Sequence, residues 1–89
     1  LEIQSAYIDL TQARDALEIT GKGVEQGQEN VRICSLGYAG GTITNEQLLD
    51  ARRDLTRATL EHISTLCEYN QAQARLKFHL NIANKTNQE

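Results

Sequence analysis

The chain has 89 residues, of which nine are Lys or Arg and twelve are Asp or Glu, so its formal net charge is −3. Charges of both signs are mixed along it, without the basic stripe that a nucleic-acid partner needs. No apolar run approaches the roughly 20 residues of a membrane-spanning helix. A chain this short buries only about 60–65% of its unfolded surface, which leaves little room for a self-contained core.

The first half of the chain predicts one long amphipathic helix over about residues 1–36. Proline is absent, so nothing interrupts a helix by removing a backbone donor. Large residues recur every seven positions, and a smaller residue follows three positions after each, as in a coiled-coil seam. The large residues are Ile3, Leu10, Leu17, Val24, Val31 and Tyr38, and the smaller ones are Ala6, Ala13, Thr20, Gly27 and Cys34.

Three glycines, Gly21, Gly23 and Gly27, fall inside this first helix. Each costs up to about 1 kcal/mol relative to alanine, which leaves a kink as one outcome. Because Leu17, Val24 and Val31 keep the seven-residue phase across the glycines, we expect a continuous helix.

The second half predicts a matching helix over about residues 45–80. Its large residues are Leu48, Leu55, His62, Tyr69 and Leu76, and its smaller ones are Ala51, Ala58, Thr65 and Ala72. Thr44 or Asn45 is a suitable N-cap, and Thr44 with Gln47 has the spacing of a capping box. Asn81 can take the left-handed conformation that ends helices. We therefore expect a frayed tail over residues 82–89.

The glycine-rich segment 37–44 separates the two repeats and predicts a tight turn. The fold class is therefore all-α: one long antiparallel coiled-coil hairpin with its tip at this turn. Small residues along the seam favour close packing of the two helices. The lengths pair Val31 with Leu55 and Val24 with His62.

Two oppositely charged pairs fit the same alignment. It sets Glu29 opposite Arg57 and Arg32 opposite Asp54, although exposed pairs of this kind contribute at most about 1 kcal/mol each.

Apolar residues outside the seam form a second stripe on each helix. These are Ile8, Ile19 and Ile33 in the first half and Leu49, Leu60, Ile63 and Leu66 in the second. Such residues need further helices to cover them. We expect the hairpin to self-associate or to form part of a larger α-barrel.

The residue types of catalytic and metal sites are present without the required arrangement. The turn lacks the lysine and the preceding strand of a phosphate-binding P-loop. His62, His79, Cys34 and Cys67 have no metal-ligand spacing. The two cysteines are separated by more than about 20 Å along the hairpin, too far for a disulfide, and we interpret both as packing residues. The sequence predicts no enzyme and no cofactor.

The tip and the second helix resemble the TolC family of outer-membrane efflux proteins. The resemblance covers about residues 36–80, and the first helix matches only in its heptad character. The motifs that carry it are Tyr38-x-x-Gly41-Thr42, then Leu48-Leu49-Asp50-Ala51, then Tyr69-Asn70-x-Ala72 followed by Leu76.

The resemblance implies that the chain is a fragment of a larger channel protein: the second helical hairpin at the periplasmic end of a trimeric tunnel. Solutes, as in multidrug efflux, would pass through the tunnel from an inner-membrane pump. It further implies that Gly40, Gly41 and Thr42 dock a periplasmic adaptor, or membrane fusion protein. Tyr38 and Asp50 match residues that gate the tunnel entrance.

Two positions depart from the family pattern. Ile43 stands where some members have a gating arginine, and Gln47 where they have a first entrance aspartate. We include Gln47 with the gating residues, but a simple capping role for Gln47 and a helix-dipole role for Asp50 remain the alternatives. The alternative for the whole chain is a coiled-coil scaffold or dimerisation module without a role in transport.

Overall fold

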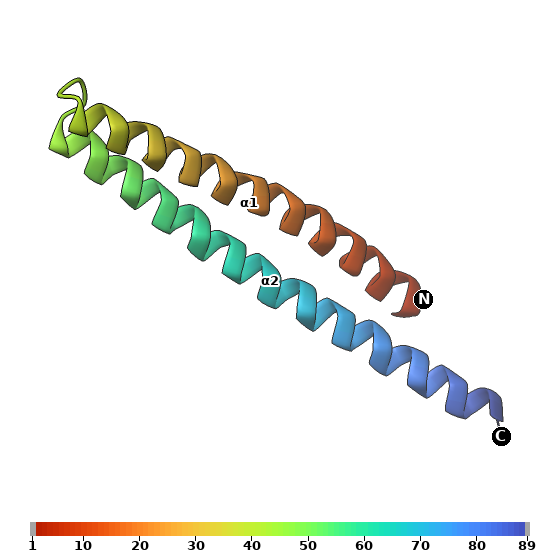
Figure 1. Cartoon of the computed structure of the whole chain (residues 1–89). Coiled ribbons are helices and arrows are strands. Elements are labelled where there is room, and N and C mark those ends of the chain that lie inside the picture. The colour runs from red at the N-terminus through yellow and green to blue at the C-terminus, as the bar shows by residue number, and fades with distance from the viewer. Residues whose placement is uncertain (1, 89) are drawn as a thin grey trace.

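The computed structural model describes residues 2–88, which form two long helices joined by a short turn (Figure 1). α1 spans Glu2–Ala39 and α2 spans Asn45–Gln88. The two helices run antiparallel and side by side, with the turn at one end. The molecule measures 72 × 15 × 13 Å. These observations confirm the predicted all-α helical hairpin.

Both helices are longer than the sequence predicts. α1 continues to Ala39, so the turn comprises residues 40–44 and not 37–44. α2 continues to Gln88, which corrects its predicted end near Leu80 and the predicted tail over residues 82–89. Asn81 takes no left-handed conformation, because no described residue other than glycine has a positive φ. The predicted outermost residues, Leu1 and Glu89, lie outside the described part of the chain.

α1 is unbroken across its three internal glycines, as the heptad phase predicts. Two of these glycines face α2. A Cβ built on Gly27 would lie 3.1 Å from Leu55 Cδ1, and one built on Gly21 would lie 3.4 Å from His62 Cε1. The helix-propensity cost of these glycines is therefore offset by close packing against large side chains of the other helix.

The core of the hairpin is narrow and made of small side chains. Among the residues whose burial the structure describes, five are buried: Ala6, Leu48, Ala51, Thr65 and Ala72. Four of the five are at the small positions of the predicted seam, and the large seam residues beside them are mostly half-buried. Small seam residues allow two helix backbones to approach closely, so the predicted character of the seam is confirmed.

The predicted pairing of the helices is wrong by about one helical turn. Leu55 packs on Gly27 instead of Val31, and His62 lies beside Gly21 instead of Val24. The physical reason is that a large side chain fits better against a glycine than against another large side chain. The heptad pattern places Gly27 at a small position of the seam, but it predicts no packing role for Gly21.

The two predicted ion pairs between the helices are also wrong. Arg32 bonds to Glu29 within α1, and Arg57 approaches Asp54 to 4.0 Å within α2. Residues three apart on one helix are neighbours whatever the tertiary register, so these charges pair within their own helix. Two other contacts between charged or ionisable groups join the helices and were not predicted: Asp9 with Arg75 at 3.6 Å, and Glu2 with His79 at 3.7 Å.

The second apolar stripes are uncovered, as expected. The residues concerned are exposed by 41% to 69%: Ile8, Ile19, Ile33, Leu49, Leu60, Ile63 and Leu66. Cys67 is exposed as well, so its predicted packing role is wrong within a single hairpin. Cys34 is half-buried and, like Cys67, is a free thiol.

Candidate functional site

The tip of the hairpin is built on a Schellman motif, a glycine-dependent helix ending. The N–H of Gly41 donates to the carbonyl of Tyr38 at 3.2 Å, and the N–H of Thr42 donates to the carbonyl of Gly37 at 2.8 Å. Gly41 has a φ of +81°, the only positive φ among the described residues. This conformation is strained for residues with a Cβ, which is why glycine occupies the position.

Gly37 is a second glycine that the tip requires, for a different reason. A Cβ on Gly37 would collide with Ile43 Cγ1 and would lie 3.2 Å from Thr42 Oγ1. The N–H of Ile43 and the hydroxyl of Thr42 each donate to the Gly37 carbonyl at 3.2 Å. The loop thus folds back over the last turn of α1. Sequence reasoning missed this contact because it links residues on either side of the turn.

The start of α2 confirms the predicted capping box. The N–H of Gln47 donates to Thr44 Oγ1 at 3.1 Å, and the N–H of Thr44 donates in return to Gln47 Oε1 at 2.9 Å. Ile43 and Leu48 occupy the two positions of a hydrophobic staple, before the cap and one turn into the helix. Leu48 is buried. The turn is therefore anchored on both sides.

The three residues predicted to dock an adaptor lie together at the extreme of the hairpin. Gly40, Gly41 and Thr42 are exposed, and a Cβ on Gly41 would meet no atom within 4 Å. A Cβ on Gly40 would lie 3.5 Å from the carbonyl oxygen of Leu36, an ordinary contact distance. The tip therefore offers bare backbone that another chain can approach.

The three residues assigned to gating have different local environments. Tyr38 lies in the last turn of α1 and its side chain is half exposed. Asp50, in the second turn of α2, approaches Arg53 to 3.7 Å, with both side chains largely in solvent. Gln47 is exposed but its carbonyl oxygen is committed to the capping box. All three keep polar atoms available to neighbouring molecules, but Gln47 offers only the N–H donors of its side-chain amide.

A polar contact in the middle of the seam was not predicted. Thr20 Oγ1 lies 3.0 Å from His62 Nδ1 and 3.1 Å from the carbonyl oxygen of Leu17. The single hydroxyl proton of threonine serves one acceptor, and a carbonyl oxygen can only accept. Both bonds form when the proton resides on His62 Nδ1 and Thr20 donates to Leu17. This arrangement fixes the seam at one position along the two helices.

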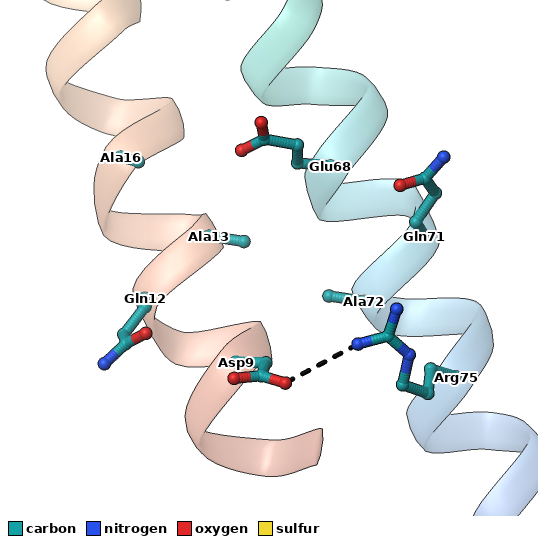
Figure 2. Close-up of a pocket in the computed structure, with 8 residues that line it drawn as sticks. All are labelled: Asp9, Gln12, Ala13, Ala16, Glu68, Gln71, Ala72 and Arg75. Carbon is teal, nitrogen blue, oxygen red and sulfur yellow. Dashed lines mark ion pairs between the residues drawn. The ribbon is translucent and has the colours of Figure 1, made fainter. Parts of the chain in front are cut away.

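A shallow groove of about 400 Å³ runs between the helices near the open end of the hairpin (Figure 2). Ala13 and Ala72 face each other across its floor, and Asp9 reaches across one end toward Arg75. Glu68 stands at the other end. The groove is open, and its rim residues are polar, so it differs in character from the exposed apolar stripe of α2.

Glu29 and Arg32 form an ion pair on the surface of α1 that shifts the pKa of both groups. Arg32 Nε donates to Glu29 Oε2 at 3.0 Å. This hydrogen bond, with the positive charge of the guanidinium, lowers the pKa of the Glu29 carboxyl and raises the pKa of Arg32. Both side chains are exposed to solvent, so these pKa shifts concern only the two groups of the pair.

Within residues 2–88, no three His, Cys, Asp or Glu side chains cluster as a metal site would require. Neither helix of this part of the chain is apolar enough over a sufficient length to span a membrane.

Comparison with known proteins adds no assignment: no protein-family model, no curated protein and no solved structure matches the chain. Its function is therefore inferred from the hairpin and its tip.

Proposed function

We propose that the chain is a periplasmic tunnel segment of an outer-membrane efflux channel, and that its tip docks a periplasmic adaptor and helps to gate the tunnel entrance. The observation that carries the proposal is the exposed tip itself. Gly40 and Gly41 present backbone without side chains, on a turn anchored by Gly37 and the Thr44–Gln47 capping box. The first of the TolC-like motifs runs from Tyr38, at the end of α1, into this turn.

Docking through the tip follows from the chemistry of its surface. Because Gly40 and Gly41 have no Cβ, a partner chain can approach the backbone there more closely than the backbone of any residue with a side chain. The hydroxyl proton of Thr42 is used within the tip, but its oxygen still accepts hydrogen bonds from a partner. A matching helical tip from an adaptor, presenting backbone or hydroxyl donors, fits this surface.

Gating is assigned chiefly to Tyr38 and Asp50. The tyrosine hydroxyl is available to hydrogen-bond neighbouring hairpins of a trimer, and the exposed carboxylate of Asp50 adds negative charge at the entrance. Gln47 stabilises the start of α2 and carries no charge. Ile43 packs on Gly37. Because isoleucine has no ionisable group, position 43 forms no ionic latch. The charge-dependent part of gating therefore rests on Asp50 alone.

The exposed apolar residues on both helices support a place in the wall of a tunnel. In that setting, neighbouring hairpins cover them, and the channel conducts solutes passively from an inner-membrane pump. The competing function is a coiled-coil scaffold, which the same exposed stripes also favour. A second, related hairpin elsewhere in the full-length protein distinguishes the two, since only the channel requires one.

The test is a bulky substitution at Gly40 of the full-length channel. Gly40 has no positive φ and its Cβ would meet only ordinary contacts, so the turn accepts a side chain there. Gly40→Trp is expected to abolish adaptor binding and solute export while trimer assembly is kept. Gly40→Ala is the matched control and should behave as wild type. Normal export by Gly40→Trp would overturn the docking assignment. Gly41→Trp is a less suitable test because it also strains the backbone.

A further inference from the structure

One backbone carbonyl, that of Gly37, holds the far side of the turn against the end of α1. The N–H of Thr42 donates to this oxygen at 2.8 Å, and the N–H of Ile43 and the hydroxyl of Thr42 each donate to it at 3.2 Å. Gly37 and Ile43 are half-buried, whereas Thr42 is exposed. The direction in which Thr42 meets a partner therefore depends on how closely the loop approaches Gly37.

The side chain of Ile43 occupies the space that a side chain at position 37 would need. A Cβ on Gly37 would collide with Ile43 Cγ1 and would lie 3.2 Å from Ile43 Cβ. Rotation about χ1 of the isoleucine moves Cγ1 but leaves its Cβ in place, because the backbone fixes that atom. A side chain at position 37 therefore pushes the loop itself away from α1.

Backbone conformation gives no other reason for glycine at position 37. Gly37 lies within α1, and Gly41 is the only described glycine with a positive φ. Alanine is preferred over glycine in a helix, so the helix alone favours a side chain here. The contact with Ile43 is what requires the glycine.

We propose that Gly37 and Ile43 are positioning residues for the docking tip. The isoleucine side chain sits where glycine leaves room, and this fit holds Thr42 in the orientation that an adaptor meets. The inference rests on the proposed function and deepens it. It gives position 43, where no ionic latch can form, a part in docking in place of gating.

A double-mutant cycle in the 89-residue chain tests the contact without any adaptor, read by NMR hydrogen exchange of the Thr42 N–H. Gly37→Ala is expected to speed this exchange by about tenfold, as loss of one hydrogen bond does. In the Ile43→Gly background, where both crowding atoms of Ile43 are gone, Gly37→Ala is expected to have little effect. Equal effects in the two backgrounds, or none in the wild type, would overturn the proposal.

Two controls accompany the cycle. Gly23→Ala makes the same change elsewhere in α1, where a Cβ would meet no atom within 4 Å, and should leave the exchange of Thr42 unchanged. Protected helical amides, such as that of Val24, show that each variant is folded. If Gly37→Ala unfolded the hairpin, refolding by Ile43→Gly would support the contact, and failure to refold would overturn it.

Adaptor binding by the full-length channel tests the consequence for docking. Gly37→Ala is expected to lose binding relative to the wild-type channel, whereas Gly37→Ala/Ile43→Gly should bind as Ile43→Gly does. Normal binding by a Gly37→Ala channel whose Thr42 exchange is fast would overturn the positioning role. A wild-type channel that binds no adaptor would instead contradict the proposed function, and the exchange cycle would still report on the contact between Gly37 and Ile43.

Discussion

Alanine substitutions at Gly27 and Gly23 are expected to change the stability of the hairpin in opposite directions. Both lie within α1, and alanine improves helix propensity by about 1 kcal/mol at either position. A Cβ at Gly23 would meet no atom within 4 Å, so Gly23→Ala keeps the whole gain. A Cβ at Gly27 would lie 3.1 Å from Leu55 Cδ1 and 3.4 Å from Leu55 Cα.

The contact with Leu55 Cδ1 decides the sign at Gly27. At 3.1 Å this methyl must give way by a few tenths of an ångström, and the rest of Leu55 lies directly beside the new Cβ, with its Cα at 3.4 Å and its Cβ at 3.6 Å, so the side chain has little room to move. Overpacking of this kind costs about 1–3 kcal/mol. After the propensity gain of about 1 kcal/mol, Gly27→Ala is expected to lose up to about 2 kcal/mol. The cost comes entirely from the packing of Leu55 on Gly27.

Thermal unfolding followed by circular dichroism at one fixed chain concentration measures both variants. For a domain of this size, 1 kcal/mol shifts Tm by about 4–8 °C. Gly23→Ala is expected to raise Tm by that amount, and Gly27→Ala is expected to lower it. The Gly23 variant controls for helix propensity. If Gly27→Ala raised Tm as much as Gly23→Ala, Leu55 would not lie against Gly27 and the helix register would be incorrect.

Three further predictions concern the tip and the surface. Gly41→Ala should cost about 1–2 kcal/mol because of the positive φ, and Gly41→Asn should cost less, both measured from Tm. Thr44→Ala should cost about 0.5–2 kcal/mol through loss of the capping box; an unchanged Tm would show that the cap contributes nothing. Arg32→Ala should raise the pKa of Glu29 toward its ordinary value in an NMR titration. Since that pKa is lowered in the folded chain, the pair stabilises the fold above the ordinary carboxyl pKa. The contribution is lost as pH falls through the lowered value.

The sequence predicts the helices and the cap well because these features depend on local interactions. The heptad phase of Leu17, Val24 and Val31 correctly indicates a helix that passes through the glycines. The pair Thr44 and Gln47 forms the predicted capping box. Four of the nine small seam residues are buried and the other five are half-buried, as expected of a seam. Each of these properties follows from residues close together in the chain.

The register and the tip contacts depend on which side chains meet across the hairpin. The helix pairing predicted from the sequence set large seam residues opposite large ones, whereas Leu55 and His62 pack beside Gly27 and Gly21. The contact of Ile43 with Gly37 likewise requires the geometry of the turn. The heptad periodicity indicates which face of each helix is buried. When one helix slides along the other by one turn, the same faces stay in contact, so the periodicity cannot select between the two registers.

The docking role of the tip is the central claim, and site-specific photocrosslinking tests it most directly. A photoreactive amino acid is placed at Thr42 of the full-length channel in cells that also produce the adaptor. A second variant carries it at Gln28, an exposed residue of α1 away from the turn. Irradiation is expected to link the adaptor to position 42 and not to position 28. Equal or absent crosslinking at the two positions would contradict the account.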